Sequence, residues 1–82
     1  MSNIVKVRLT QNDQFVVTDP VTGIEKVVSS SVLHAPNFIT TSSVKHFLCE
    51  EFGAADWDCS ADALERIRGI TDFNTLNDEV RF

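Results

Sequence analysis

Hydrophobic and polar residues alternate along the first third of the chain. Residues 4–10 place their apolar side chains on one face of an extended segment and their polar side chains on the other. A period of two is typical of a strand with one buried face. Residues 15–18 and 24–28 are rich in β-branched residues as well, so we predict a second and a third strand there.

The short segment between the second and third predicted strands has the composition of a hairpin loop. Pro20 suits the first central position of a type I turn, because its ring holds φ at about −65°. Gly23 can adopt the left-handed conformation that closes such a hairpin. We therefore predict a three-stranded antiparallel meander in residues 1–28.

The apolar period changes to that of a helix after residue 41. Four apolar residues form one stripe: Val44, Phe47, Leu48 and Phe52. Ser42 or Ser43 is expected to be the N-cap, because a hydroxyl can accept a hydrogen bond from an unpaired backbone N–H. Gly53 is expected to end this helix.

A second helix is predicted from Ser60 to Arg68, with Asp58 or Ser60 as its cap and Gly69 as its end. The tail after it has two interpretations. Asp72 can begin a third short helix, and Glu79–Phe82 can form a final strand.

The order of these elements indicates an α+β fold. We expect a three-stranded antiparallel meander, with an optional fourth strand at Asn37–Thr40, followed by two or three short helices packed on one face. The chain is expected to be a single domain, with a meander (1–28), a loop that packs back on the core (29–41) and a helical half (42–82).

Composition supports a small globular domain. Of 82 residues, 43% are hydrophobic and 23% are charged, which argues against disorder. The chain has no run of about 20 apolar residues that would span a bilayer, and its N-terminus lacks the pattern of a signal peptide. We therefore expect no membrane contact and a cytoplasmic location, in the host cytoplasm if the protein is viral.

Charge is uneven along the chain and changes the functional expectation. Residues 1–40 are neutral overall, whereas residues 41–82 carry the whole net charge of −5. Six acidic residues follow one another with no Lys or Arg between them: Glu50, Glu51, Asp56, Asp58, Asp62 and Glu65. Such a segment repels a phosphate backbone and attracts a basic protein surface. We expect no direct nucleic-acid binding.

Residue types used in metal and nucleophile sites are present but badly spaced. The possible zinc ligands are His34, His46, Cys49 and Cys59, which include no Cys-x₂₋₄-Cys pair. Cys49 lies late in its helix beside two glutamates, which disfavours the thiolate that a His46–Cys49 nucleophile would need. Both cysteines are expected to be thiols.

Two further kinds of site lack essential residues. A calcium loop starting at Asp56 would need a glutamate at its twelfth position, where Ile67 stands. The three glycines are isolated, so there is no phosphate-binding loop. We expect no cofactor, no metal and no enzymatic activity.

Protein binding is the function that these patterns favour. The first hypothesis is a small acidic protein that occludes a basic surface of a larger partner. By analogy of size and charge alone, it would act as an inhibitor in the manner of phage-encoded or antitoxin proteins. Its predicted contact residues are Glu50, Glu51, Asp56, Trp57, Asp58, Asp62 and Glu65. Trp57 would be the anchor, because tryptophan is enriched at interface hot spots.

Two alternative functions remain open. The chain can be a peptide-recognition domain that uses a sheet edge, or a small structural subunit of a larger assembly such as a virus particle. The edge can also form a homodimer. The element order is similar to that of precursor-peptide recognition elements, although no diagnostic motif accompanies it.

Overall fold

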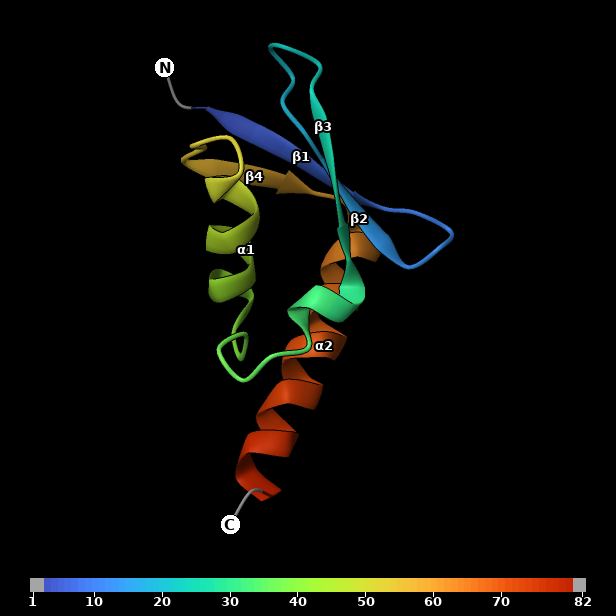
Figure 1. Cartoon of the computed structure of the whole chain (residues 1–82), viewed down its shortest axis with the longest axis vertical. Helices are drawn as coiled ribbons and strands as arrows, with labels where there is room; N and C mark the ends of the chain where they lie inside the picture. The colour runs from blue at the N-terminus through green and yellow to red at the C-terminus, as the bar shows by residue number, and fades with distance from the viewer. Residues whose placement is uncertain (1–2, 81–82) are drawn as a thin grey trace.

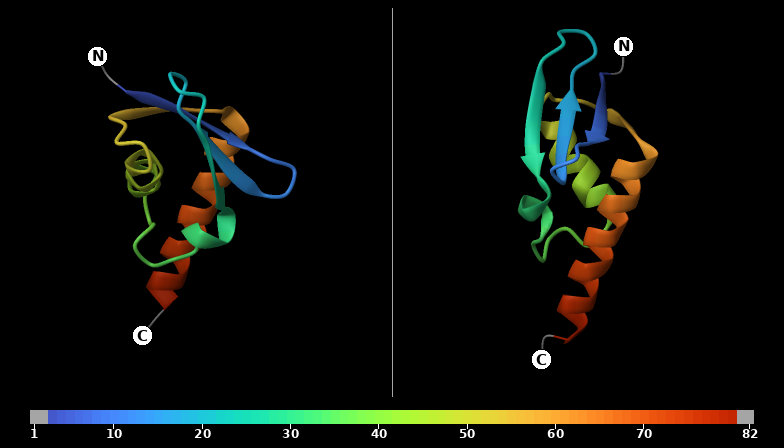
Figure 2. Two further views of the ribbon diagram at one scale, coloured as in Figure 1. Left: turned by 45° about the horizontal axis from the view of Figure 1, so that its top comes forward. Right: turned by 90° about the vertical axis from the view of Figure 1, so that its right-hand side faces the viewer.

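A computed structural model describes residues 3–80 as a four-stranded sheet with two α-helices, which confirms the α+β class (Figure 1). The sheet order is β3-β2-β1-β4, and both helices lie on the same face of the sheet (Figure 2). The elements are β1 (Ile4–Leu9), β2 (Gln14–Thr18), β3 (Glu25–Ser29), the 3₁₀ helix η1 (Ser30–Leu33), α1 (Thr41–Glu50), β4 (Asp56–Cys59) and α2 (Ala61–Val80).

The predicted meander is confirmed for β1, β2 and β3. These strands pair antiparallel, and Val5 and Val7 of β1 turn into the core as their alternation requires. The hairpin between β2 and β3 is closed by a hydrogen bond from the Asp19 N–H to the Ile24 carbonyl at 2.9 Å. Gly23 has φ of 77°, the left-handed conformation expected of it.

A fourth strand exists, but it is not the one that the sequence suggested. The prediction of a strand at Asn37–Thr40 is wrong, because that segment contains no strand and follows the 3₁₀ helix. Its backbone is satisfied differently: the Asn74 side-chain amide donates to the carbonyls of Leu33 at 2.9 Å and Phe38 at 2.8 Å. A side chain of α2 thus donates the hydrogen bonds that these carbonyls would otherwise accept from a neighbouring strand.

The observed fourth strand, β4, pairs parallel to β1 in a segment that was expected to link two helices. Its four residues include two aspartates, which are poor strand formers, so local propensity did not reveal it. Pairing with β1 places Trp57 beside Val5 and Cys59 beside Val7. The sheet is therefore mixed rather than purely antiparallel.

Helix α1 begins slightly earlier than predicted. Thr40, not Ser42 or Ser43, is the N-cap, and its hydroxyl accepts from the Ser43 N–H at 3.2 Å. Val44 and Leu48 of the predicted stripe are fully buried. Gly53 follows the helix with φ of 61°, which confirms that the chain turns there.

Helix α2 does not end at Gly69 but continues to Val80. Ile70, Thr71 and Asn74 lie beyond the glycine and are buried, so packing holds the helix through a residue of low propensity. The predicted final strand is wrong for Glu79 and Val80, which are helical. Its other two positions, 81 and 82, lie outside the described residues.

The core lies between the sheet and the helices. Its largest fully buried side chains come from every layer: Phe15 of β2, Leu33 of η1, Leu48 of α1, and Ile67 and Ile70 of α2. Among the residues that the structure describes, no helix covers the opposite face of the sheet (Figure 2). That arrangement leaves one sheet face and the sheet edges as surfaces formed by strands.

Candidate protein-binding surfaces

Much of the predicted acidic set is engaged by neighbouring basic groups. Glu50 lies 2.9 Å from the His46 imidazole one helical turn earlier, and Glu51 lies 3.1 Å from the Lys26 ammonium on β3. Glu51 therefore faces the β3 side of the molecule. Its charge is partly balanced before any partner arrives.

Two aspartates of the set are also engaged. The Lys45 ammonium lies 2.7 Å from the Asp56 carboxylate, and this hydrogen bond is the main reason that the pKa of Asp56 is lowered. Asp62 lies in the first turn of α2, where it accepts from the Ser60 hydroxyl at 2.6 Å and the Ala63 N–H at 2.9 Å. These bonds lower its pKa, because they favour the charged form.

The remaining members of the set lie on β4 and the following helix. Asp58 and Glu65 are exposed, and neither is in an ion pair with another residue between 3 and 80. Trp57 is half-buried, because it lies on the core side of β4 and packs against the core cluster. The structure thus retains a smaller unpaired acidic surface than the sequence suggested.

The histidines and cysteines form no recognisable reactive centre. Cys49 is buried, and burial raises the pKa of its thiol. Burial also raises the pKa of Cys59 to about 11, with Asp62 and Asp58 adding to the effect. Among the described residues there is no group of three or more side chains placed to hold a metal ion.

The edge of β3 is a second candidate surface, of the kind that a peptide-recognition domain would use. β3 is the last strand on its side of the sheet, and Figure 2 (right) shows no other described segment beyond it. Strand backbone at such an edge keeps unpaired N–H and C=O groups that can accept another strand. The opposite edge, β4, is shorter and carries two aspartates, which discourage pairing.

The hydrogen-bond pattern shows which backbone groups of β3 face outward. The Asp19 N–H donates to Ile24, and the Ser30 N–H donates to the Asp13 carbonyl at 3.3 Å. In an antiparallel ladder, residues that bond to the neighbouring strand alternate with residues that do not. The backbone groups of Glu25, Val27 and Ser29 therefore point to the open side.

Side chains leave the centre of this edge uncharged. Lys26 is drawn toward the helical layer, where its ammonium meets Glu51 and lies 5.8 Å from the centre of the Phe52 ring. Val27 lies on the uncovered face and is 60% exposed, although Val16 beside it on β2 is only 4% exposed. The other charged residue of β3, Glu25 at its start, lies 3.5 Å from Arg8 of β1, so the centre of the edge presents an exposed valine and no unpaired charge that would oppose strand addition.

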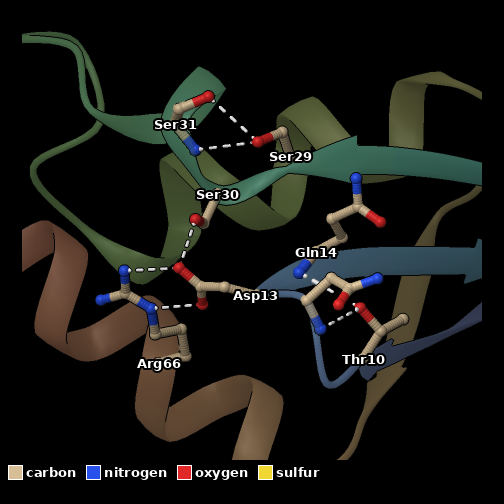
Figure 3. Close-up of polar contacts among 8 residues, drawn as sticks. Thr10, Asp13, Gln14, Ser29, Ser30, Ser31 and Arg66 are labelled. Carbon is tan, nitrogen blue, oxygen red and sulfur yellow. Dashed lines mark hydrogen bonds and ion pairs between the residues drawn. The ribbon is translucent and has the colours of Figure 1, made fainter.

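The far end of β3 is held in place by a polar network. The Asp13 carboxylate accepts two hydrogen bonds from the Arg66 guanidinium, at 2.8 and 2.9 Å, and one from the Ser30 hydroxyl at 2.6 Å (Figure 3). The contacts join the β1–β2 turn, the end of β3 and helix α2. These contacts hold the end of β3 in a defined position. A partner strand would therefore pay a smaller entropic cost of ordering when it pairs with this edge.

A second apolar surface lies on the part of α2 that extends away from the sheet (Figure 1). Phe73 and Leu76 are exposed there, and the rings of Phe73 and His34 form a T-shaped pair with their centres 5.4 Å apart. A shallow hollow is lined by His34, Pro36, Phe73 and Asn77. Of the described side chains that line this hollow, only that of His34 is titratable.

No helix among residues 3–80 combines the length and apolarity needed to cross a bilayer. The chain matches no protein-family model, no curated protein and no solved structure.

Proposed function

We propose that this chain is a protein-binding domain that adds an extended segment of a partner to the open edge of β3. Two observations together carry the proposal. The backbone groups of Glu25, Val27 and Ser29 point to the open side of the sheet, and the side chain of Val27, the middle residue of the three, is 60% exposed. Backbone hydrogen bonds would supply affinity, and side-chain contacts on the uncovered face would supply selectivity.

The energetics suit a binding module rather than a permanent contact. Each added hydrogen bond contributes about 0.5–1.5 kcal/mol net, and β3 has only five residues to offer. The partner would gain further by covering Val27, because burying apolar surface is favourable at about 25 cal/mol per Å². Partners with a β-branched residue opposite Val27 are favoured, since such pairs stabilise sheets.

The test uses short random peptides displayed on phage and selected against the immobilised chain. A selected peptide is then titrated into the isotope-labelled protein, and amide shifts are followed by NMR. We expect the largest shifts at β3 and its neighbours. A Val27→Lys variant should bind about tenfold more weakly, a loss of about 1.4 kcal/mol, because a charged side chain at the edge opposes pairing.

The matched control is Val21→Lys, which adds the same charge at the hairpin tip, where Val21 is 84% exposed. This variant should bind the peptide like the unaltered chain. The proposal is wrong if selected peptides bind the Val27→Lys variant with unchanged affinity, or if their shifts map away from β3.

Occlusion of a basic surface is a second candidate function. It is favoured by the net charge of −5 and by the exposed carboxylates of Asp58 and Glu65. This mode differs from edge pairing in its response to salt, because the screening length falls from about 30 Å at 0.01 M to about 3 Å at 1 M. A complex that dissociates at high salt and is abolished by Asp58→Asn with Glu65→Gln would favour it.

A further inference from the structure

We propose that the segment that pairs with β3 is the β3 strand of a second copy of this chain, antiparallel to the first about a twofold axis at Val27. The inference rests on the proposed function, because it uses the same open edge and names its occupant. Three features of β3 support self-pairing. The first is its backbone phase, meaning which of its residues point their N–H and C=O groups to the open side. The others are its charge pattern and the row of valines across the sheet that ends at this edge.

The backbone phase permits the symmetric arrangement. Val27 directs its N–H and C=O to the open side, so two copies of Val27 placed opposite each other can exchange both hydrogen bonds. Glu25 and Ser29 have the same phase, and in this arrangement Glu25 of one copy faces Ser29 of the other. The twofold axis therefore passes through a hydrogen-bonded pair, with further pairs on both sides.

The charge pattern selects the register. An axis at Glu25 would oppose two carboxylates, and an axis at Lys26 would oppose two ammonium groups, which is destabilising in directly facing pairs. With the axis at Val27, Lys26 of one copy faces Val28 of the other, and the two copies of β3 overlap along their whole length. An axis at Val28 shortens the overlap, because η1 begins at Ser30.

The apolar row on the uncovered face becomes continuous in this register. Arg8, Val16 and Val27 are cross-strand neighbours on β1, β2 and β3. Val16 is 4% exposed, whereas Val27, at the end of the row, is 60% exposed. A second copy would place its own Val27 beside the first, so the row would contain four adjacent valines between two arginines. The two four-stranded sheets would form one sheet, with the helices of both copies on the same face.

The area at the edge sets the expected strength. A standard stable interface buries about 1,600 Å², and the pairing of two five-residue strands buries much less. We therefore expect a weak dimer that forms as the concentration rises from micromolar to millimolar. Sedimentation of the unaltered chain should show the mass rising from 9.1 kDa toward twice that value.

Crosslinking locates the contact. Val27→Cys and Val21→Cys are each treated with a short bis-maleimide at high concentration. The symmetric pairing brings the two positions 27 together, with Cα atoms about 5.5 Å apart. It keeps the two positions 21 more than about 20 Å apart, because each lies beyond Ile24, three residues from the axis, at about 3.4 Å per residue. We expect the Val27→Cys chain to crosslink at least about ten times faster.

Position 21 is a stringent control because Val21 is more exposed than Val27, so random collisions would favour it. Both variants retain Cys49 and Cys59 equally. Val27→Lys should sediment as a monomer at millimolar concentration, while Val27→Thr, which keeps a β-branched uncharged residue, should still dimerise. Circular dichroism checks that each variant is folded.

The outcomes separate this inference from the proposed function. The inference is overturned if the unaltered chain stays monomeric at millimolar concentration, or if position 21 crosslinks as fast as position 27. If the chain is monomeric and selected peptides still shift the β3 amides, edge binding stands and only the occupant is wrong. If neither a second copy nor any peptide contacts β3, both fail.

Discussion

Asp13 has a left-handed backbone conformation, with φ of 58°, in the turn between β1 and β2. Aspartate and asparagine tolerate this region better than most residues, because their short polar side chains can bond locally. The hydrogen bonds from Arg66, followed by the one from Ser30, lower the pKa of Asp13 from 3.8 to about 2. The residue therefore combines a conformational role with an electrostatic one.

Replacement of Asp13 by Asn isolates the charge from the conformation, because Asn retains the left-handed preference. The folded pKa of about 2 lies below the ordinary value of 3.8, so the carboxylate stabilises the fold above that ordinary value. This stabilisation is lost as the pH falls through about 2. Since both partners are partly exposed, we expect Asp13→Asn to cost about 1 kcal/mol at pH 7.

Urea unfolding at pH 7, 4, 3 and 2 measures this effect. The difference between Asp13→Asn and the unaltered chain should shrink as the pH falls from about 4 toward 2. Asp72→Asn, at an exposed position of α2, is the control and should show little change. A difference that stays constant with pH would show that the ion pair contributes nothing.

At the scale of single elements, α2 shows how packing overrides a local signal. Gly69 predicted the end of a helix, yet the helix continues because Ile70, Thr71 and Asn74 are buried beyond it. A sequence pattern cannot reveal this, since it does not say which later residues find partners in the core. Gly53 gave a correct signal, because its positive φ of 61° is a property of its own backbone.

The two glycines should respond oppositely to alanine. A Cβ at Gly69 would have no heavy atom within 4 Å beyond its own helix and neighbours, so Gly69→Ala should stabilise the protein by about 0.5–1 kcal/mol. Gly53→Ala also meets open space, but its positive φ makes alanine destabilising by about 1 kcal/mol. Thermal and urea unfolding measure both. Equal effects of the same sign would contradict this account of α2.

At the scale of the whole molecule, Asn74 joins the end of α2 to the segment between β3 and α1. Its amide donates to the buried backbone at Leu33 and Phe38, which are 41 and 36 residues away in the chain. No local rule could assign these partners. They explain why residues 34–40 need no strand and why the last part of α2 stays helical.

Removal of the Asn74 amide should be costly because it leaves two carbonyls without their donor. We expect Asn74→Ala to lower the free energy of unfolding by about 2–3 kcal/mol. Asn77→Ala, one turn along and exposed, should change it by less than about 0.5 kcal/mol. Chemical denaturation of the pair provides the measurement. Similar values for both variants would show that the Asn74 contacts do not hold the two segments together.

The sequence by itself determined the elements whose signals are local. The alternation in β1, the β-branched residues of β2, the Pro20–Gly23 loop and the stripe from Val44 to Leu48 each arise from residues that are neighbours in an element, and all are confirmed. The concentration of acidic residues after position 50 is likewise a fact of the sequence. The sequence did not determine whether those carboxylates are paired with basic groups in the folded protein.

Only the tertiary structure decided the features that depend on distant residues. β4 is a strand because it pairs with β1, α2 is long because its later turns pack into the core, and Glu51 is paired because the side chain of Lys26 leaves β3 on the helical side of the sheet. The open edge, with Val27 at its centre, is also a result of strand order. The physical reason is common to all four: hydrogen bonds, burial and charge pairing need a partner, and only the fold decides which groups have one.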